Sequence, residues 1–124
     1  MSNPLLFKAY VAGGAINPYR IVRITNADTV EQAAAVLNTL IGVNTDLPIV
    51  SGERVEVMMQ GIAYVEAGAA IAVGAPVTSD SSGRGIAAAP AAGANQRIIG
   101  FALDAAVAAG DQIRVLLSPG QVQG

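Results

Sequence analysis

Polar and apolar residues alternate most regularly between Glu53 and Met59, where Val55, Val57 and Met59 fall on one side of an extended chain. Because successive side chains of a strand point to opposite faces, this pattern predicts a half-buried β-strand. Further short runs rich in Ile and Val recur about every ten residues, separated by Gly, Pro, Asn or Ser. These predicted strands cover residues 5–12 (a first strand or an extended arm), 19–25, 40–43, 62–66, 76–78, 97–103 and 112–117.

One segment departs from the strand pattern. Asp28-Thr-Val-Glu31 has the form of a helix capping box, in which a side-chain acceptor is followed three residues later by a glutamate. Val30, Ala33, Ala34 and Leu37 then recur at helical spacing. The segment therefore predicts a helix of about two to three turns.

Turn-forming residues divide the second half of the chain. Residues 79–85 are Ser, Asp, Gly and Arg between two apolar runs, which predicts the tip of a hairpin joining residues 76–78 to Ile86. Residues 87–95, made mostly of Ala, Gly and Pro, predict a surface loop. Ser118-Pro119-Gly120 is expected to end the fold.

Composition agrees with a β-rich chain. The 25 Ile and Val residues outnumber the 8 Leu residues, and β-branched side chains suit a pleated sheet better than a helix. Short strands at regular spacing predict an all-β fold, with the one short helix, built as a small β-barrel or a β-tulip-like sandwich. A length of 124 residues is typical of one domain. The predicted organisation is an N-terminal arm or first strand (1–18), one β-rich domain (19–120) and a C-terminal tail (121–124).

Charge and missing residue types exclude several classes of function. The seven Lys and Arg residues are scattered and the net charge is −2, which disfavours nucleic acid as a partner. With no Cys and no His, the chain has no thiolate ligand and no base that titrates near neutrality. The longest uncharged stretches fall short of the ~20 residues of a membrane helix, so no membrane partner is expected. Lys8 follows Leu5-Leu6-Phe7, the wrong order for a secretion signal, so use without export is expected.

A carboxylate pair is the remaining route to catalysis. Glu53, Glu56 and Glu66 are the candidates for a small hydrolase, and that hypothesis requires at least one of them in a pocket. On a strand, however, Glu56 shares its face with Arg54, as on a solvated outer surface. Asp80 has only hydroxyl neighbours to help it bind a cation, too few for a Ca²⁺ loop. The sequence therefore predicts no catalytic residue, no metal and no cofactor.

The order of several short segments resembles one known family. The similar stretches are, in order, 30–35 with 40–43, 52–57 with 61–66, 67–68 to 74–77, 80–84, 99–102, 109–111 and 115–120. Taken together they resemble the capsid cement or head decoration proteins of tailed bacteriophages and prophages. The resemblance implies a non-enzymatic virion protein, made in the host cytoplasm, that binds the outside of the expanded capsid. Its implied partners are the major capsid protein, several subunits of which it would bridge, and itself, as a homotrimer or a dimer.

Two segments are predicted to contact the capsid. The first is an N-terminal arm, because Leu5, Leu6 and Phe7 form an apolar cluster with few local partners; an ordinary first strand explains them equally well. The predicted arm residues are Asn3, Pro4, Leu5, Leu6, Phe7 and Tyr10. The second is the hairpin tip, with Ser79, Asp80, Ser81, Ser82 and Arg84. An alternative function is a trimeric tail or fibre module, although such modules usually expose Trp or Tyr clusters and this chain has no Trp.

Overall fold

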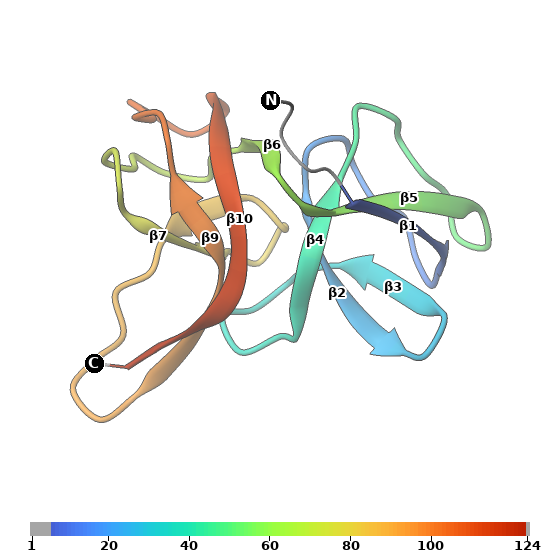
Figure 1. Ribbon diagram of the computed structural model, residues 1–124, viewed down its shortest axis with the longest axis horizontal. Coiled ribbons are helices and arrows are strands. Elements are labelled where there is room, and N and C mark those ends of the chain that lie inside the picture. Colours follow the sequence, from blue (N-terminus) through green and yellow to red (C-terminus); the bar gives the residue numbers. More distant parts are fainter. Residues whose placement is uncertain (1–5, 124) are drawn as a thin grey trace.

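The computed structural model describes residues 6–123, which form ten strands in two sheets (Figure 1). The first five strands close into a barrel, shown at the right of Figure 1, in the order β1-β3-β2-β4-β5. They are β1 (Leu6–Ala12), β2 (Ile21–Asn26), β3 (Thr29–Gln32), β4 (Leu40–Asn44) and β5 (Arg54–Gln60). Neighbouring strands are antiparallel except β1 and β3, and the pairing of β1 with β5 closes the barrel.

The second sheet follows directly from the barrel, in the order β6-β10-β9-β7-β8. Its strands are β6 (Ile62–Glu66), β7 (Pro76–Ser79), β8 (Gly85–Ala87), β9 (Asn95–Ala102) and β10 (Gln112–Gln123). Gly61 alone separates β5 from β6 and has a φ of 107°, a conformation that glycine adopts without steric cost. The chain therefore passes from one sheet to the other in a single residue.

Two apolar clusters form the core. The first fills the barrel and consists of Tyr10, Ala12, Ile16, Val22, Val30, Val55 and Val57. The second lies between the barrel and the other sheet, where Ile21, Leu40 and Val43 of the barrel pack with Val65, Ile99 and Val115, among others. Ile21 and Val22 are adjacent on β2, yet each belongs to a different cluster because strand side chains alternate. The strand β2 is therefore buried on both faces and joins the two sheets.

The predicted all-β class and the predicted barrel are confirmed, whereas the predicted helix is wrong. Thr29–Gln32 forms the strand β3, paired with β2 and β1, and Val30 is fully buried in the barrel. Asp28 lies in the tight turn between β2 and β3, where its N–H donates to Asn26 Oδ1 over 3.3 Å. Pairing on both sides of β3 outweighs the local capping pattern, as tertiary context commonly does. Residues 6–123 form no helix, and thus none that could cross a membrane.

The other predicted elements lie close to the observed strands. The hairpin is formed by β7 and β8, with Ser79 opposite Gly85, and residues 88–94 form the loop before β9. The last strand is longer than expected, because β10 continues to Gln123 beyond the segment predicted to end the fold. Its register shifts between Leu117 and Gly120, and this irregularity accommodates Pro119, which has no N–H to donate.

Candidate binding surface

The N-terminal segment is part of the barrel from Leu6 onward. Tyr10 is buried, and its hydroxyl donates to Met59 Sδ over 3.9 Å inside the barrel. Leu6 and Phe7, in contrast, are among the exposed apolar residues of the structure. The predicted arm residues Asn3, Pro4 and Leu5 lie outside the described residues. Of the predicted arm, the described part therefore offers Leu6 and Phe7 at the surface, with Tyr10 turned inward.

Phe7 continues an apolar row across the barrel. It lies opposite Met58 on β5, and Met58 lies opposite Val43 on β4. Val43 belongs to the cluster between the two sheets, and Met58 packs against this cluster. Phe7 is thus the exposed end of an apolar row that runs into the core.

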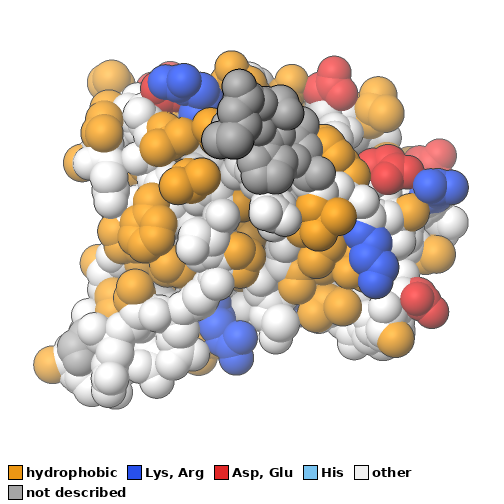
Figure 2. Space-filling view, viewed as in Figure 1, with side chains coloured by type: hydrophobic (Ala, Val, Ile, Leu, Met, Phe, Trp, Pro, Cys, Tyr) orange, Lys and Arg blue, Asp and Glu red, His pale blue; other side chains and the backbone are white. Residues whose placement is uncertain are grey.

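A second apolar row crosses the outer face of the other sheet. Ile62 on β6 lies opposite Leu116 on β10, Leu116 lies opposite Phe101 on β9, and Phe101 lies opposite Pro76 on β7. We call these four residues the outer row. Leu116 is 44% exposed, Phe101 38% and the neighbouring Tyr64 54%. Figure 2 shows hydrophobic side chains gathered over β9 and β10, at the left of the view.

The outer row was not predicted from the sequence, although the sequence contains one signal for it. On β10, Ile113, Val115 and Leu117 point into the core, so Leu116 occupies a position where alternation expects a polar residue. Phe101 on β9 and Tyr64 on β6 break the pattern in the same way. An apolar residue at an outward position on three strands indicates a surface that meets another molecule.

An ion pair borders the outer row. Arg114, two residues before Leu116 on β10, donates from Nε and Nη2 to the two carboxylate oxygens of Asp104, at 2.9 and 2.8 Å. The Arg114 backbone N–H donates to the same carboxylate over 2.9 Å. These hydrogen bonds lower the pKa of Asp104 from 3.8 to about 2. The bonds from the guanidinium have the largest effect, and the bond from the backbone N–H has the next largest. The pair adds no net charge to the surface beside the outer row.

The pH dependence of this pair can be tested directly. Because the pKa of Asp104 is lowered by folding, the contribution of the ion pair to stability is present above pH 3.8 and is lost as the pH falls towards 2. We expect an NMR titration of the Asp104 carboxyl carbon to show a midpoint of about 2. Arg114→Gln should raise that midpoint towards 3.8, whereas the control Arg54→Gln should leave it unchanged. A midpoint that is the same in all three proteins would contradict the assignment.

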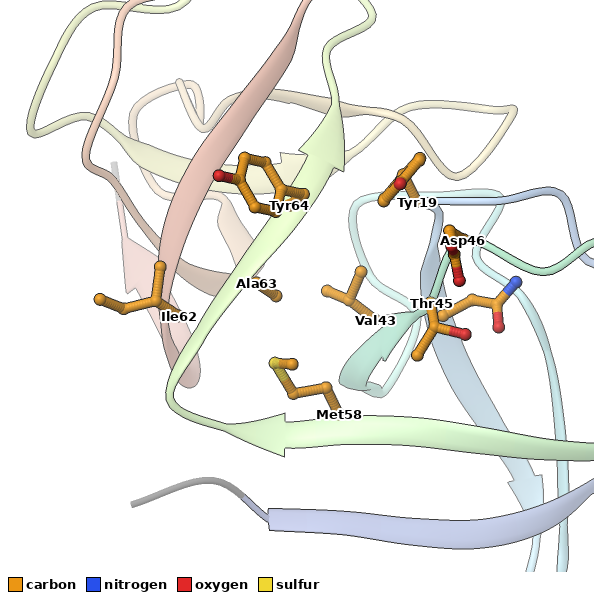
Figure 3. A pocket seen from close by; sticks show the side chains of 9 residues that line it. Tyr19, Val43, Thr45, Asp46, Met58, Ile62, Ala63 and Tyr64 are labelled. Atoms are coloured by element: carbon orange, nitrogen blue, oxygen red, sulfur yellow. The ribbon is translucent and has the colours of Figure 1, made fainter. Parts of the chain in front are cut away.

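A pocket of about 290 Å³ lies where the barrel meets β6 (Figure 3). Val43, Met58 and Ala63 supply apolar walls from β4, β5 and β6, and Ile62 and Tyr64 line the β6 side. On the opposite side lie Tyr19, Thr45 and Asp46. Asn44 also lines the pocket. Because Ile62 also belongs to the outer row, the pocket opens beside that apolar surface.

Two sets of hydrogen bonds keep the pocket in shape. Tyr19 has a φ of 59°, which is uncommon for a residue other than glycine, and it persists where surrounding bonds hold it. Its N–H donates to the Thr45 carbonyl and its carbonyl accepts from the Glu66 N–H, both over 3.0 Å. Asn44 is buried and donates from Nδ2 to the carbonyls of Asn17 and Leu47, at 3.0 and 2.9 Å. These bonds fix the loop from β4 around the pocket.

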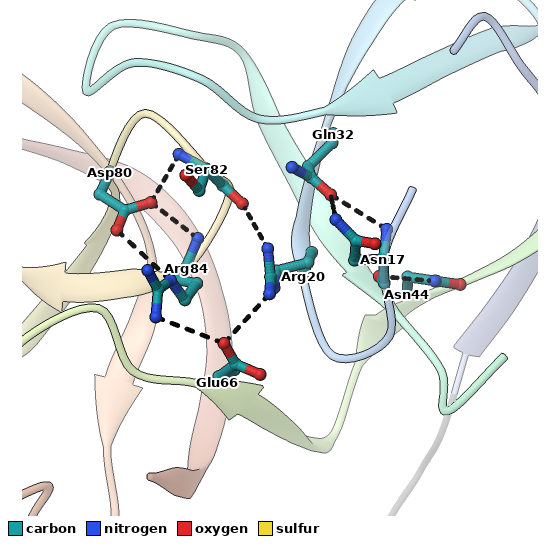
Figure 4. Close-up of polar contacts among 8 residues, drawn as sticks. All are labelled: Asn17, Arg20, Gln32, Asn44, Glu66, Asp80, Ser82 and Arg84. Carbon is teal, nitrogen blue, oxygen red and sulfur yellow. Dashed lines mark hydrogen bonds and ion pairs between the residues drawn. The ribbon is translucent and has the colours of Figure 1, made fainter. Parts of the chain in front are cut away.

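The predicted hairpin tip is turned onto the barrel (Figure 4). Asp80 Oδ1 accepts from the backbone N–H groups of Ser82 and Arg84, at 2.8 and 2.9 Å, and so shapes the turn. Arg20, just before β2, then donates to the Ser82 carbonyl over 2.9 Å and to Glu66 Oε2 over 3.0 Å. Arg84 lies 3.5 Å from the same Glu66 oxygen. We call Arg20, Glu66, Asp80, Ser82 and Arg84 the clasp.

The clasp gives the hairpin tip a structural role. It joins residues from the barrel, from β6 and from the β7–β8 turn, and the Gly83 carbonyl accepts from the Ile21 N–H on β2 over 2.8 Å. Ser79 is fully buried, and Ser81 is the one exposed residue among the five predicted contact residues of this tip. Through the Ser82 carbonyl, which accepts from Arg20, and through Arg84, which pairs with Glu66, the tip helps to hold the two sheets together, and its contact with a capsid stays a prediction.

The three candidate carboxylates serve local structure. Glu53 accepts from the Val50 N–H over 2.8 Å, Glu56 pairs with Arg54 at 2.9 Å, and Glu66 belongs to the clasp. None of the three lines the pocket of Figure 3 or a second, more open one lined by Tyr10, Asp28 and Arg54. The arrangement that a carboxylate-dependent hydrolase needs is not formed around these pockets.

Aligned, exposed apolar side chains on a charge-poor β body are typical of proteins that bind another macromolecule. A family model of phage cement proteins matches residues 16–117, and the chain belongs to this family, as its sequence predicted. It is therefore a structural protein associated with the phage capsid. No curated protein sequence matches the chain.

A solved structure supports the fold. The chain is similar to the head fiber gp8.5 N base of bacteriophage phi29, with a TM-score of 0.69 and 17% sequence identity. The similarity covers 98% of this chain and 100% of the other. The barrel followed by a second sheet is thus a fold that also occurs in another phage head protein.

Proposed function

We propose that the protein binds the outer surface of the expanded phage capsid and reinforces it by bridging major capsid protein subunits. The observation that carries this proposal is the outer row, whose apolar side chains are aligned across four strands, with Leu116 and Phe101 exposed and the two end residues partly exposed. Exposed apolar surface of this kind is typical of an interface, and the ion pair of Arg114 with Asp104 leaves no unbalanced charge beside it. Membership of the cement family supports a capsid as the partner.

Rigidity would make such a contact effective. The shared core and the clasp hold the two sheets as one body, so the outer row and the exposed Leu6 and Phe7 keep a constant spacing. Two contacts held at a constant spacing bind far more strongly together than either does alone. A homotrimer, or a dimer, would multiply the contacts again. Separation of neighbouring capsid subunits would then require several contacts to fail at once.

The proposal is tested by adding the protein to purified, expanded heads that lack decoration and measuring binding by co-sedimentation and imaging. Wild type should bind the outer surface, and bound heads should resist heating better than bare heads. The double variant Phe101→Gln with Leu116→Gln should bind at least about 30-fold more weakly, since a buried apolar contact residue at an interface contributes about 2 kcal/mol or more.

Val107→Gln is the matched control, because Val107 is 84% exposed but lies outside the outer row. It should bind like wild type. Failure of wild type to bind, or equal binding by the double variant and the control, would refute the proposed role of this surface.

A second candidate is a base that attaches a fibre to the phage head. The similarity of fold to the phi29 head fiber base over 98% of the chain favours it. Imaging of complete phage particles separates the two functions: a cement protein leaves compact density on the shell, whereas a fibre base carries density that extends away from it.

A further inference from the structure

The strand β6 has one unpaired edge. The Leu117 N–H donates to the Gly61 carbonyl over 2.9 Å, and the Ala67 N–H donates to the Asp111 carbonyl over 2.7 Å. These two bonds show which residues of β6 form hydrogen-bonded pairs with β10. Because hydrogen-bonded residues alternate along an antiparallel pair, Ala63 and Val65 bond to β10, whereas the backbone groups of Ile62 and Tyr64 face away from it. Within residues 6–123, no backbone partner meets Ile62 or Tyr64 on that side.

The edge ends at a defined point. The next outward-facing group, the N–H of Glu66, donates to the Tyr19 carbonyl over 3.0 Å. Tyr19 thus occupies the position where a neighbouring strand would continue, and the open part of the edge is limited to Ile62 and Tyr64. These two residues offer two N–H donors and two carbonyl acceptors in one line.

The pocket lies beside this open edge and is lined by apolar side chains and one carboxylate. Ile62, Ala63 and Tyr64 of β6 form one of its walls, and Val43 and Met58 add apolar surface behind them. Its one charged lining residue is Asp46, which is exposed and has no cationic partner among the ion pairs of the described residues. A partner that binds at this edge would therefore contact the apolar walls of the pocket and the negative charge of Asp46.

We propose that this edge receives an extended segment of the major capsid protein as an added strand. The segment would pair with the backbone of Ile62 and Tyr64, place one large apolar side chain in the pocket and direct a neighbouring Lys or Arg towards Asp46. Strand addition of this type obtains its affinity from main-chain bonds and its specificity from pockets for alternate side chains. The inference rests on the proposed function. It assigns recognition of the capsid segment to the β6 edge and the pocket.

The experiment compares Tyr64→Pro with Tyr64→Thr in the head-binding assay. Proline lacks the N–H that faces the open edge, and it is tolerated on edge strands at such positions, whereas threonine keeps the N–H and suits a strand. Tyr64→Pro should bind undecorated expanded heads at least about tenfold more weakly than Tyr64→Thr.

Asp46→Lys, a change at an exposed side chain, should also weaken binding about tenfold at low salt and less at high salt.

Hydrogen exchange supplies a readout that does not depend on any variant. In wild type bound to heads, the amides of Ile62 and Tyr64 should gain protection, while Ala63 and Val65, already bonded to β10, should change little. If wild type does not bind heads at all, the proposed function fails and this inference fails with it. If wild type binds but Ile62 and Tyr64 gain no protection, strand addition is overturned and capsid binding through the outer row stands. If Tyr64→Pro does not fold, the exchange result and Asp46→Lys still decide.

Discussion

Replacing Gly100 by alanine is expected to lower the free energy of unfolding by about 3 kcal/mol or more. Gly100 lies on β9 opposite Leu117, beside the register shift of β10, where the two backbones approach closely. A Cβ at this position would overlap the carbonyl oxygen of Leu116, which is main chain and cannot rotate away. Since β9 is the central strand of the second sheet and β10 is paired with it, separating them would disturb the shared core. Chemical denaturation followed by circular dichroism measures the change.

Gly120→Ala is the matched control for this prediction. Gly120 lies on the same strand pair, yet the atoms nearest to an added Cβ are 3.8 and 3.9 Å away, which is ordinary contact. Its substitution should change the free energy of unfolding by no more than about 0.5 kcal/mol. Equal stabilities for the two variants would show that the close approach at Gly100 is not a constraint on the fold.

Replacing Glu66 by alanine is expected to lower the free energy of unfolding by about 2 kcal/mol. The side chains of Arg20 and Glu66 are 15% and 24% exposed, and Arg84 shares the same carboxylate oxygen. Loss of the carboxylate leaves two neighbouring guanidinium groups with little solvent and no shared anion. Removing one partner of a buried ion pair costs about 3–5 kcal/mol, and partial exposure reduces that figure here.

The pair Arg54 with Glu56 supplies the control, because its side chains are 73% and 49% exposed. Glu56→Ala should cost less than about 1 kcal/mol, as for most surface ion pairs. Amide exchange gives a local check on the clasp, since the Ile21 N–H donates to Gly83 in the hairpin tip. Ile21 should lose more protection than Val55 in the barrel interior after Glu66→Ala. Similar losses of stability in both alanine variants would contradict a special role for the clasp.

The clasp also bears on the binding surface. Glu66 receives two guanidinium groups through its side chain, while its backbone N–H bonds to Tyr19 at the margin of the pocket. One residue therefore takes part in both the junction of the sheets and the boundary of the open β6 edge. A weakened clasp should reduce capsid binding as well as stability, because the two sheets would no longer hold the pocket in one shape.

Local sequence was sufficient to determine the class of the fold and most of its strands. The alternation from Glu53 to Met59 became β5, and the turn residues between Ser79 and Gly85 became the β7–β8 hairpin. Both patterns express short-range physics: side chains alternate along a strand, and Gly, Ser and Asp tolerate the backbone angles of tight turns. The ordered set of short segments was likewise sufficient to predict the cement family.

Only the tertiary structure decided which residues meet one another. The segment after Asp28 had a helical pattern but became β3, because it could pair with strands on both sides. Arg20, Glu66 and Arg84 are far apart in the chain and gave no joint signal, yet they form the clasp. Leu116 and Phe101 likewise form one apolar surface only once strand register aligns them with their neighbours across the sheet. Register is set by pairing between distant strands and by burial of the opposite face of the sheet. The alignment of these apolar side chains therefore depends on the whole core and not on any single segment.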